Sequence, residues 1–191
     1  MQWRCVAPLM AALVFGIVAC GDITSPKAAL PTFRDSAAVY ALNGAPSGAP
    51  TAFYAYAEQV VHADPSFRFD VAFDIDASGQ ALLLPVRTVA NGLASSHAVG
   101  LQTVATPFDS LGVAPSSGYR RDSTMIVPVG TTVVIESADP LACGGSFVAS
   151  TIYAKLVVDA VDPKARQLRL RWVVDPNCGF RSFASGVPPW T

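Results

Sequence analysis

Charged residues are scarce in this sequence: 13 Lys and Arg stand against 14 Asp and Glu in 191 residues. Nucleic-acid-binding domains carry a basic patch or stripe, and neither sign of charge forms such a cluster here. The glycine-rich fingerprints of phosphate loops and dinucleotide-binding folds are missing too. The sequence therefore excludes nucleic acid as a partner and predicts no cofactor.

The start of the chain lacks a hydrophobic run long enough to span a bilayer. The uncharged stretch from Cys5 to Cys20 is interrupted by Pro8, whereas a transmembrane helix needs about 20 consecutive apolar residues. One cation, Arg4, a short apolar core and small residues at its end are instead typical of a signal peptide.

The end of this core has a more specific pattern. Residues 17–20 read Ile-Val-Ala-Cys, which resembles the lipobox of bacterial lipoproteins. The resemblance covers only the first tenth of the chain. It implies that the Cys20 thiol receives a diacylglyceryl group, that the signal is cut before Cys20, and that the new amino terminus is acylated. Two or more acyl chains give stable membrane anchoring. The alternative is an ordinary secretory signal with a coincidental cysteine.

The resemblance divides the chain into three parts. Residues 1–19 are expected to be a cleaved signal peptide, 20–36 a lipidated and flexible tether, and 37–191 a single all-β domain. The protein is then expected in the cell envelope, attached to a membrane through Cys20. In the lipoprotein family Gly21 after the cysteine is compatible with export to the outer membrane, on its periplasmic or surface face.

Cysteines are few, and two remain for the domain. Cys5 leaves with the signal, and the resemblance assigns Cys20 to the lipid. Cys143 and Cys178 form a pair in an oxidising compartment, which predicts a disulfide. It would close a loop of about 35 residues and stabilise the fold by roughly 3–4 kcal/mol. The rival zinc site is disfavoured because two cysteines without a nearby histidine are poor zinc ligands.

Strand patterns dominate the rest. Strict alternation over residues 67–76 predicts a half-buried strand with Asp70 and Asp74 on its solvent face. Its apolar face consists of Phe67, Phe69, Val71, Phe73 and Ile75. A hairpin is predicted around a loop at 163–165. Its opposed pairs are Ala154–Val174, Leu156–Trp172, Val158–Leu170, Ala160–Leu168, Asp159–Arg169 and, at the loop, Asp162–Arg166.

About eight to ten short strands with turns between them, and no convincing amphipathic helix, indicate an all-β fold. Long crossing connections and the expected disulfide favour a Greek-key β-sandwich. The alternative is a lipocalin-like β-barrel. Such a barrel would carry a small apolar ligand against the face of Phe67, Phe69 and Phe73.

A weak calcium candidate lies in residues 74–80. Asp74, Asp76 and Ser78 alternate before Gly79, as in the first half of a calcium loop. The second half fails, because Pro85 occupies the position of the bidentate Glu. The simpler interpretation is a tight turn opened by Asp76, with the other aspartates facing water.

The sequence predicts no catalytic residues. A Ser-His-Asp site would need His62 or His97, the two histidines, and Ser95 and Ser96 adjoin His97. Adjacency in sequence is not triad geometry, and the Gly-x-Ser-x-Gly elbow is absent. Both histidines are therefore expected in loops, at the surface or rim.

Aromatic and basic side chains offer a third set of candidates. Arg120 and Arg121 are either an anion contact or a solvated pair. A sugar- or peptide-binding face, as opposed to core or lid packing, would involve Phe53, Tyr54, Tyr56, Tyr119, Trp172 and Trp190.

Taken together, these patterns predict a lipid-anchored envelope domain with a binding or structural role and no catalysis. An envelope protein or a glycan is the expected partner, and the sequence does not name the ligand. The alternatives are the apolar-ligand carrier and, with less support, a hydrolase.

Overall fold

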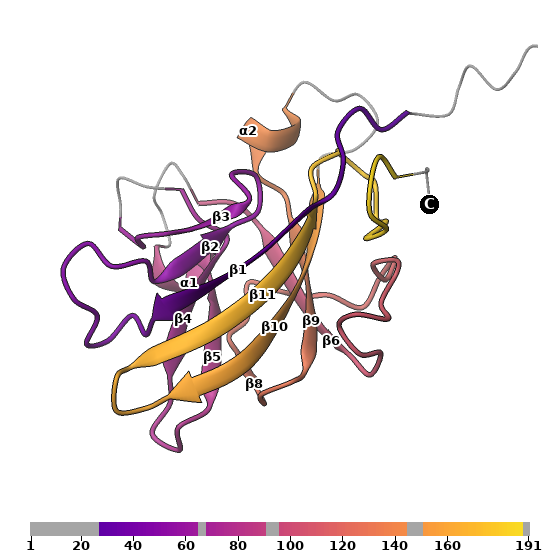
Figure 1. Ribbon diagram of the computed structural model, residues 1–191. Coiled ribbons are helices and arrows are strands. Elements are labelled where there is room, and N and C mark those ends of the chain that lie inside the picture. Colours follow the sequence, from indigo (N-terminus) through magenta and orange to yellow (C-terminus); the bar gives the residue numbers. More distant parts are fainter. Residues whose placement is uncertain (1–26, 65–67, 91–95, 145–150, 189–191) are drawn as a thin grey trace, which may run out of the picture.

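The computed structural model describes residues 27–64, 68–90, 96–144 and 151–188. Two antiparallel sheets pack face to face (Figure 1), which confirms the predicted all-β sandwich. Sheet A has six strands in the order β1(Phe33–Tyr40), β11(Gln167–Asp175), β10(Ile152–Asp162), β9(Thr132–Ser137), β6(Val99–Val104) and β7(Arg120–Arg121). Sheet B has five, in the order β3(Gln59–Val61), β2(Ala52–Tyr54), β4(Val71–Ile75), β5(Ala81–Pro85) and β8(Met125–Val127).

The strand order of sheet A is of the Greek-key type. β9, β10 and β11 follow one another and pair in sequence order, and β1 lies beside β11. The sheets do not close into a barrel, so the lipocalin-like alternative is wrong. Two short helices complete the described elements: α1(Val86–Val89) and α2(Pro140–Cys143). In the described part of the chain, no helix is long and apolar enough to cross a membrane.

The core lies between the two sheets. The rings of Phe53 and Trp172 pack 5.5 Å apart between their centroids, and both side chains are fully buried. Phe69 and Phe73 belong to the same apolar cluster. The two residues therefore fill the interior of the sandwich, contrary to the cavity wall that the carrier hypothesis assigned to them; Phe67 lies outside the described residues.

Strand β4 is buried on both faces, so the prediction of a half-buried strand is wrong. Asp70 and Asp74 are 0% and 6% exposed. The reason is that polar groups from distant loops cover this face. The Arg166 guanidinium, from the turn between β10 and β11, pairs with Asp74 and donates to the Ile75 carbonyl.

The hairpin prediction is correct in the middle and wrong near the turn. Ala154–Val174, Leu156–Trp172 and Val158–Leu170 are opposed as predicted. A β-bulge between Val158 and Ala160 then shifts the register, so that Ala160 lies opposite Arg169 and Val161 opposite Leu168. The strands end at the pair Asp162–Gln167, and Arg166 adopts a left-handed φ of 54° within the turn.

The bulge also changes the predicted charge pair. Asp159 accepts two hydrogen bonds from the Arg171 guanidinium, at 2.7 and 2.9 Å, instead of pairing with Arg169. One extra residue in a strand displaces every later cross-strand pair, and the sequence pattern alone does not show where it is inserted.

The disulfide between Cys143 and Cys178 is present, as predicted. It joins α2 to the segment after β11. The β-structure begins earlier than predicted: residues 33–36, assigned to the tether, belong to β1. Before them, the Asn177 side chain accepts from the backbone N–H groups of Ala29 and Leu30 at 2.8 and 3.0 Å. Cys20 lies outside the described residues.

Candidate functional site

His97, expected in a loop at the rim, is buried between the sheets and 3% exposed. Its Nε2 lies 2.6 Å from Oδ1 of Asp70, just before β4. The Ser137 hydroxyl, at the end of β9, donates to the same Asp70 oxygen at 2.5 Å. The Ala55 N–H donates to the other Asp70 oxygen at 2.6 Å. Asp70 thus links sheet B to sheet A through buried hydrogen bonds.

A second buried carboxylate, Asp139, extends this network. It caps α2 by accepting from the Leu141 N–H, and it accepts from Arg68 at 2.9 Å and from the Tyr54 hydroxyl at 2.6 Å. Burial, together with the hydrogen bond to Asp139, raises the pKa of the Tyr54 hydroxyl well above its usual range. His97 lies between the two carboxylates, with Nδ1 4.0 Å from Asp139.

Ser137, His97 and Asp70 are the three residue types of a hydrolase triad, but their geometry differs from one. In a triad the serine and the carboxylate contact opposite nitrogens of the imidazole. Here both contact Nε2: Ser137 Oγ lies 3.3 Å and Asp70 Oδ1 2.6 Å from it. The Ser137 hydroxyl donates its hydrogen bond to Asp70, and not to the imidazole. The arrangement joins the sheets, and all three side chains are closed to solvent.

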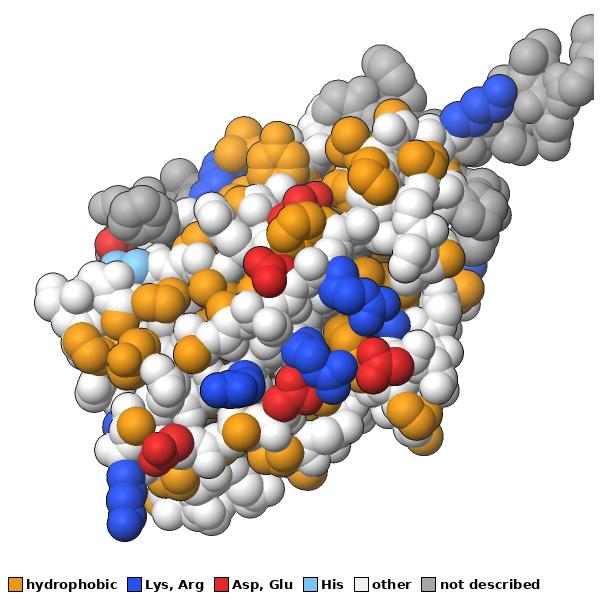
Figure 2. Space-filling model, viewed as in Figure 1, with side chains coloured by type: hydrophobic (Ala, Val, Ile, Leu, Met, Phe, Trp, Pro, Cys, Tyr) orange, Lys and Arg blue, Asp and Glu red, His pale blue; other side chains and the backbone are white. Residues whose placement is uncertain are grey.

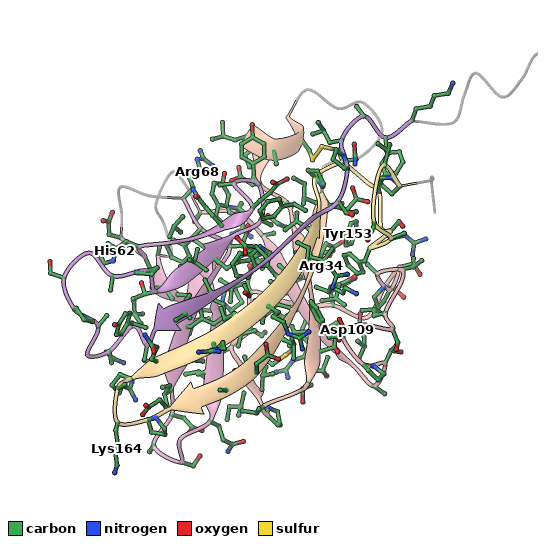
Figure 3. All side chains as sticks on the ribbon, in the orientation of Figure 1. Arg34, His62, Arg68, Asp109, Tyr153 and Lys164 are labelled. Carbon is green, nitrogen blue, oxygen red and sulfur yellow. A yellow bond between two sulfur atoms is a disulfide. The ribbon has the colours of Figure 1, made fainter. Side chains whose placement is uncertain are left out.

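The other residues considered for a hydrolase lie elsewhere. His62 lies on the segment after β3, and its Nδ1 is 2.9 Å from the Ala49 carbonyl. Figure 3 shows the His62 side chain apart from Arg68, which belongs to the buried network. Ser96 immediately precedes His97, and Ser95 lies outside the described residues. Sequence reasoning did not single out Ser137 and Asp139. The Asp139-Pro140 pair is a readable helix start, an N-cap followed by proline at the first helical position.

The calcium candidates do not converge. Asp74 is buried and pairs with Arg166, so the expectation that it faces water is wrong. Asp76 Oδ1 accepts from the backbone of Ser78 and Gln80 and from the Ser78 hydroxyl. These bonds, that of Gln80 first, lower the pKa of Asp76. The segment is a tight turn with Gly79 at φ 82°. Among the described residues no three His, Cys, Asp or Glu side chains cluster as metal ligands.

The predicted aromatic set is dispersed. Phe53 and Trp172 are core residues. Tyr54 and the half-exposed Tyr56 form an edge-on pair at 5.9 Å. Tyr119 packs with Tyr153 on the outer face of sheet A at 6.2 Å, and Trp190 is outside the described residues. The aromatic side chains that are described therefore do not form one binding face.

The outer face of sheet A carries a small second core around a buried lysine. The Lys155 amine donates to the carbonyls of Phe108 and Leu111 at 2.6 and 2.7 Å, which fastens the loop after β6 to β10. Burial, assisted by the nearby Arg34 guanidinium, lowers the pKa of Lys155 to about 8. Around it both signs of charge alternate (Figure 2), as in the Arg34–Asp109 pair (Figure 3).

The two adjacent arginines have different surroundings. Arg121 pairs with Glu136 at 2.6 Å. Arg120 has no ion pair within the described part of the chain, and it lines an open pocket of about 350 Å³ between β6 and β8. The lining residues are Leu101, Gln102, Thr103, Gly118, Arg120, Met125 and Ile126.

Comparisons with protein-family models, with curated proteins and with solved structures find no match for this chain.

Proposed function

We propose that this protein is a lipid-anchored domain of the cell envelope that acts by binding or structural contact and carries out no catalysis. The observation that supports this most is the buried Asp70–His97–Ser137 network. It assembles the residue types of a nucleophilic site, yet it holds the two sheets together and its three side chains are buried.

The lipobox at residues 17–20 supports the anchor. The described chain begins at the end of the sandwich that holds α2 and the disulfide, opposite the β10–β11 turn (Figure 1). Ala29, where Asn177 fixes the chain, lies nine positions after Cys20, and nine fully extended Cα-to-Cα steps span about 30 Å. The anchored domain would therefore present its β10–β11 turn away from the bilayer.

The first test is the intact mass of the protein from the membrane fraction, with and without reductant. We expect residues 20–191 with diacylglyceryl and acyl groups, and a gain of two hydrogens when the Cys143–Cys178 bond is reduced. A Cys20→Ser variant should leave the membrane fraction. An unlipidated mass for the wild-type chain would overturn the anchor.

The second test addresses catalysis. A fluorophosphonate probe reacts with activated serines, and we expect it to leave Ser137 of the folded protein unlabelled because the hydroxyl is buried and donates to Asp70. A known serine hydrolase treated in parallel is the positive control. Labelling of Ser137 that disappears in a Ser137→Ala variant would favour the hydrolase instead.

A further inference from the structure

We propose that the pocket between the free edges of β6 and β8 binds an extended peptide segment that carries an acidic side chain. This inference rests on the binding role proposed above and specifies its ligand class. Among the residues that the structure describes, three independent features of the pocket support it: strand backbone without a partner strand, a cation without an ion pair and a buried acceptor without a donor.

The first feature is the backbone of β6, which extends beyond its edge partner. β7 pairs with only two residues of β6. The Val99 carbonyl accepts from Asp122 on the β7 side, and the Ala98 carbonyl accepts from Ala138 on the β9 side. Because antiparallel strands alternate in this way, the N–H and carbonyl of Thr103 point to the β7 side, where β7 has ended. Such an edge accepts an added strand.

The second feature is the charge of Arg120. The neighbouring charged groups are already engaged: Glu136 with Arg121 at 2.6 Å, and Asp122 with Arg87 at 3.1 Å. Within the described residues Arg120 forms no ion pair, and it lines the pocket. A carboxylate on the bound segment supplies the missing charge, and guanidinium–carboxylate hydrogen bonds are among the stronger ones.

The third feature is the polar and apolar lining. Gln102 Oε1 is buried and has no hydrogen-bond partner in the described part of the chain, so turning this amide toward the pocket would let a peptide N–H satisfy it. Gly118, at φ 95°, packs closely against this amide: a Cβ there would lie 3.0 Å from Gln102 Nε2. Met125 and Ile126 supply the apolar part of the lining, and Ile126 is 51% exposed. Alternating polar and apolar contacts of this kind suit an extended chain.

The test uses a fluorescein-labelled pentapeptide, Thr-Val-Glu-Val-Thr with an amidated end, and the full mature chain. Fluorescence anisotropy should show saturable binding, at least about tenfold weaker for a peptide with Lys in place of Glu. An Arg120→Gln variant should weaken binding of the acidic peptide by about tenfold. Arg169→Gln is the matched control and should change nothing, because Arg169 is an exposed arginine on β11, away from the pocket. Equal binding of the two peptides, or equal effects of the two variants, would overturn the proposal.

Two further reagents test the strand addition itself. A peptide N-methylated at both valines, and a Thr103→Pro variant that lacks the outward N–H, should each bind at least about fivefold more weakly. Unchanged binding of the methylated peptide would overturn the extended binding mode. If Thr103→Pro lowers the thermal midpoint of the protein, the result with the methylated peptide is the one that decides. These measurements do not depend on lipidation, so a missing anchor and a missing peptide site would be recognised separately.

Discussion

At the residue scale, two buried charged groups of this domain, Asp70 and Lys155, are matched by partners distant in sequence. The Asp70 carboxylate accepts a hydrogen bond from Ser137 and contacts His97. The Lys155 amine donates hydrogen bonds to two carbonyls of the loop after β6. An unpaired charge in such places costs several kcal/mol, whereas a hydrogen-bonded one is tolerated. Each of these groups therefore reports on the packing of two separate segments.

Lys155 gives a prediction about pH. Burial lowers its pKa to about 8 in the folded chain, from the usual lysine value of 10.5 that applies in the unfolded chain. The unfolded chain therefore holds the proton more tightly. The free energy of unfolding should rise by about 1–2 kcal/mol between pH 7.5 and 9.5. Above pH 10 the raised pKa values of Tyr54 and Tyr119 act in the opposite direction.

Urea unfolding at the two pH values measures this change. A Lys155→Met variant should lack the rise, since the titrating amine is gone. An equal rise in the free energy of unfolding between pH 7.5 and 9.5 for both proteins would show that Lys155 is not its source.

At the element scale, the β10–β11 hairpin is held at its tip by one side chain. The Arg166 guanidinium donates to the carbonyls of Asn43 and Ile75 at 3.0 Å and pairs with Asp74. These contacts join the turn of sheet A to β4 of sheet B. They explain why a strand that alternates in sequence is buried on both faces.

Replacing Arg166 by Ala should destabilise the domain by about 2–4 kcal/mol, because it leaves the buried Asp74 carboxylate unpaired. The double-mutant cycle with Asp74→Ala should give a coupling of at least about 1 kcal/mol. Chemical unfolding measures both. Arg169→Ala, an exposed arginine in the same hairpin, should stay within about 0.5 kcal/mol of wild type; a similar loss there would contradict the bridging role.

At the scale of the whole molecule, the disulfide and the point where the described chain enters the domain lie at the same end of the sandwich. The disulfide joins α2 to the segment after β11, and Asn177 holds the incoming chain beside it. The opposite end carries the β10–β11 turn. A tether at the first end, as proposed above, would leave β8 and the part of β6 beyond β7 accessible from the side.

Removing the disulfide by Cys143→Ser and Cys178→Ser together should lower the free energy of unfolding by roughly 3 kcal/mol, as the loop of 35 residues implies. Cys143 belongs to the core cluster and Cys178 packs against it, but neither cysteine lies in a strand of the two sheets, so the double variant should keep the wild-type circular dichroism spectrum. Thermal unfolding with and without reductant is the measurement. A wild-type midpoint that does not respond to full reduction would contradict the estimate from loop closure.

Several features were readable from local pattern alone. The central pairs of the hairpin, such as Leu156–Trp172, followed from a period of two on both strands. The pairing of Cys143 with Cys178 was correct. The bulge beyond Val158 could not be predicted, because the alternating pattern does not show where an extra residue is inserted into a strand.

The sequence by itself determined that this chain forms strands and turns, since alternation and turn residues act over a few neighbouring positions. Only the tertiary structure decided that His97 and Asp70 are buried between the sheets and that Asp74 pairs with Arg166. It also decided that Arg120 lies in a pocket where β7 ends, without an ion pair among the residues that the structure describes. The physical reason is that burial and charge pairing depend on which distant segments meet, and in a sandwich of crossing connections that is settled by the packing of the two sheets as a whole.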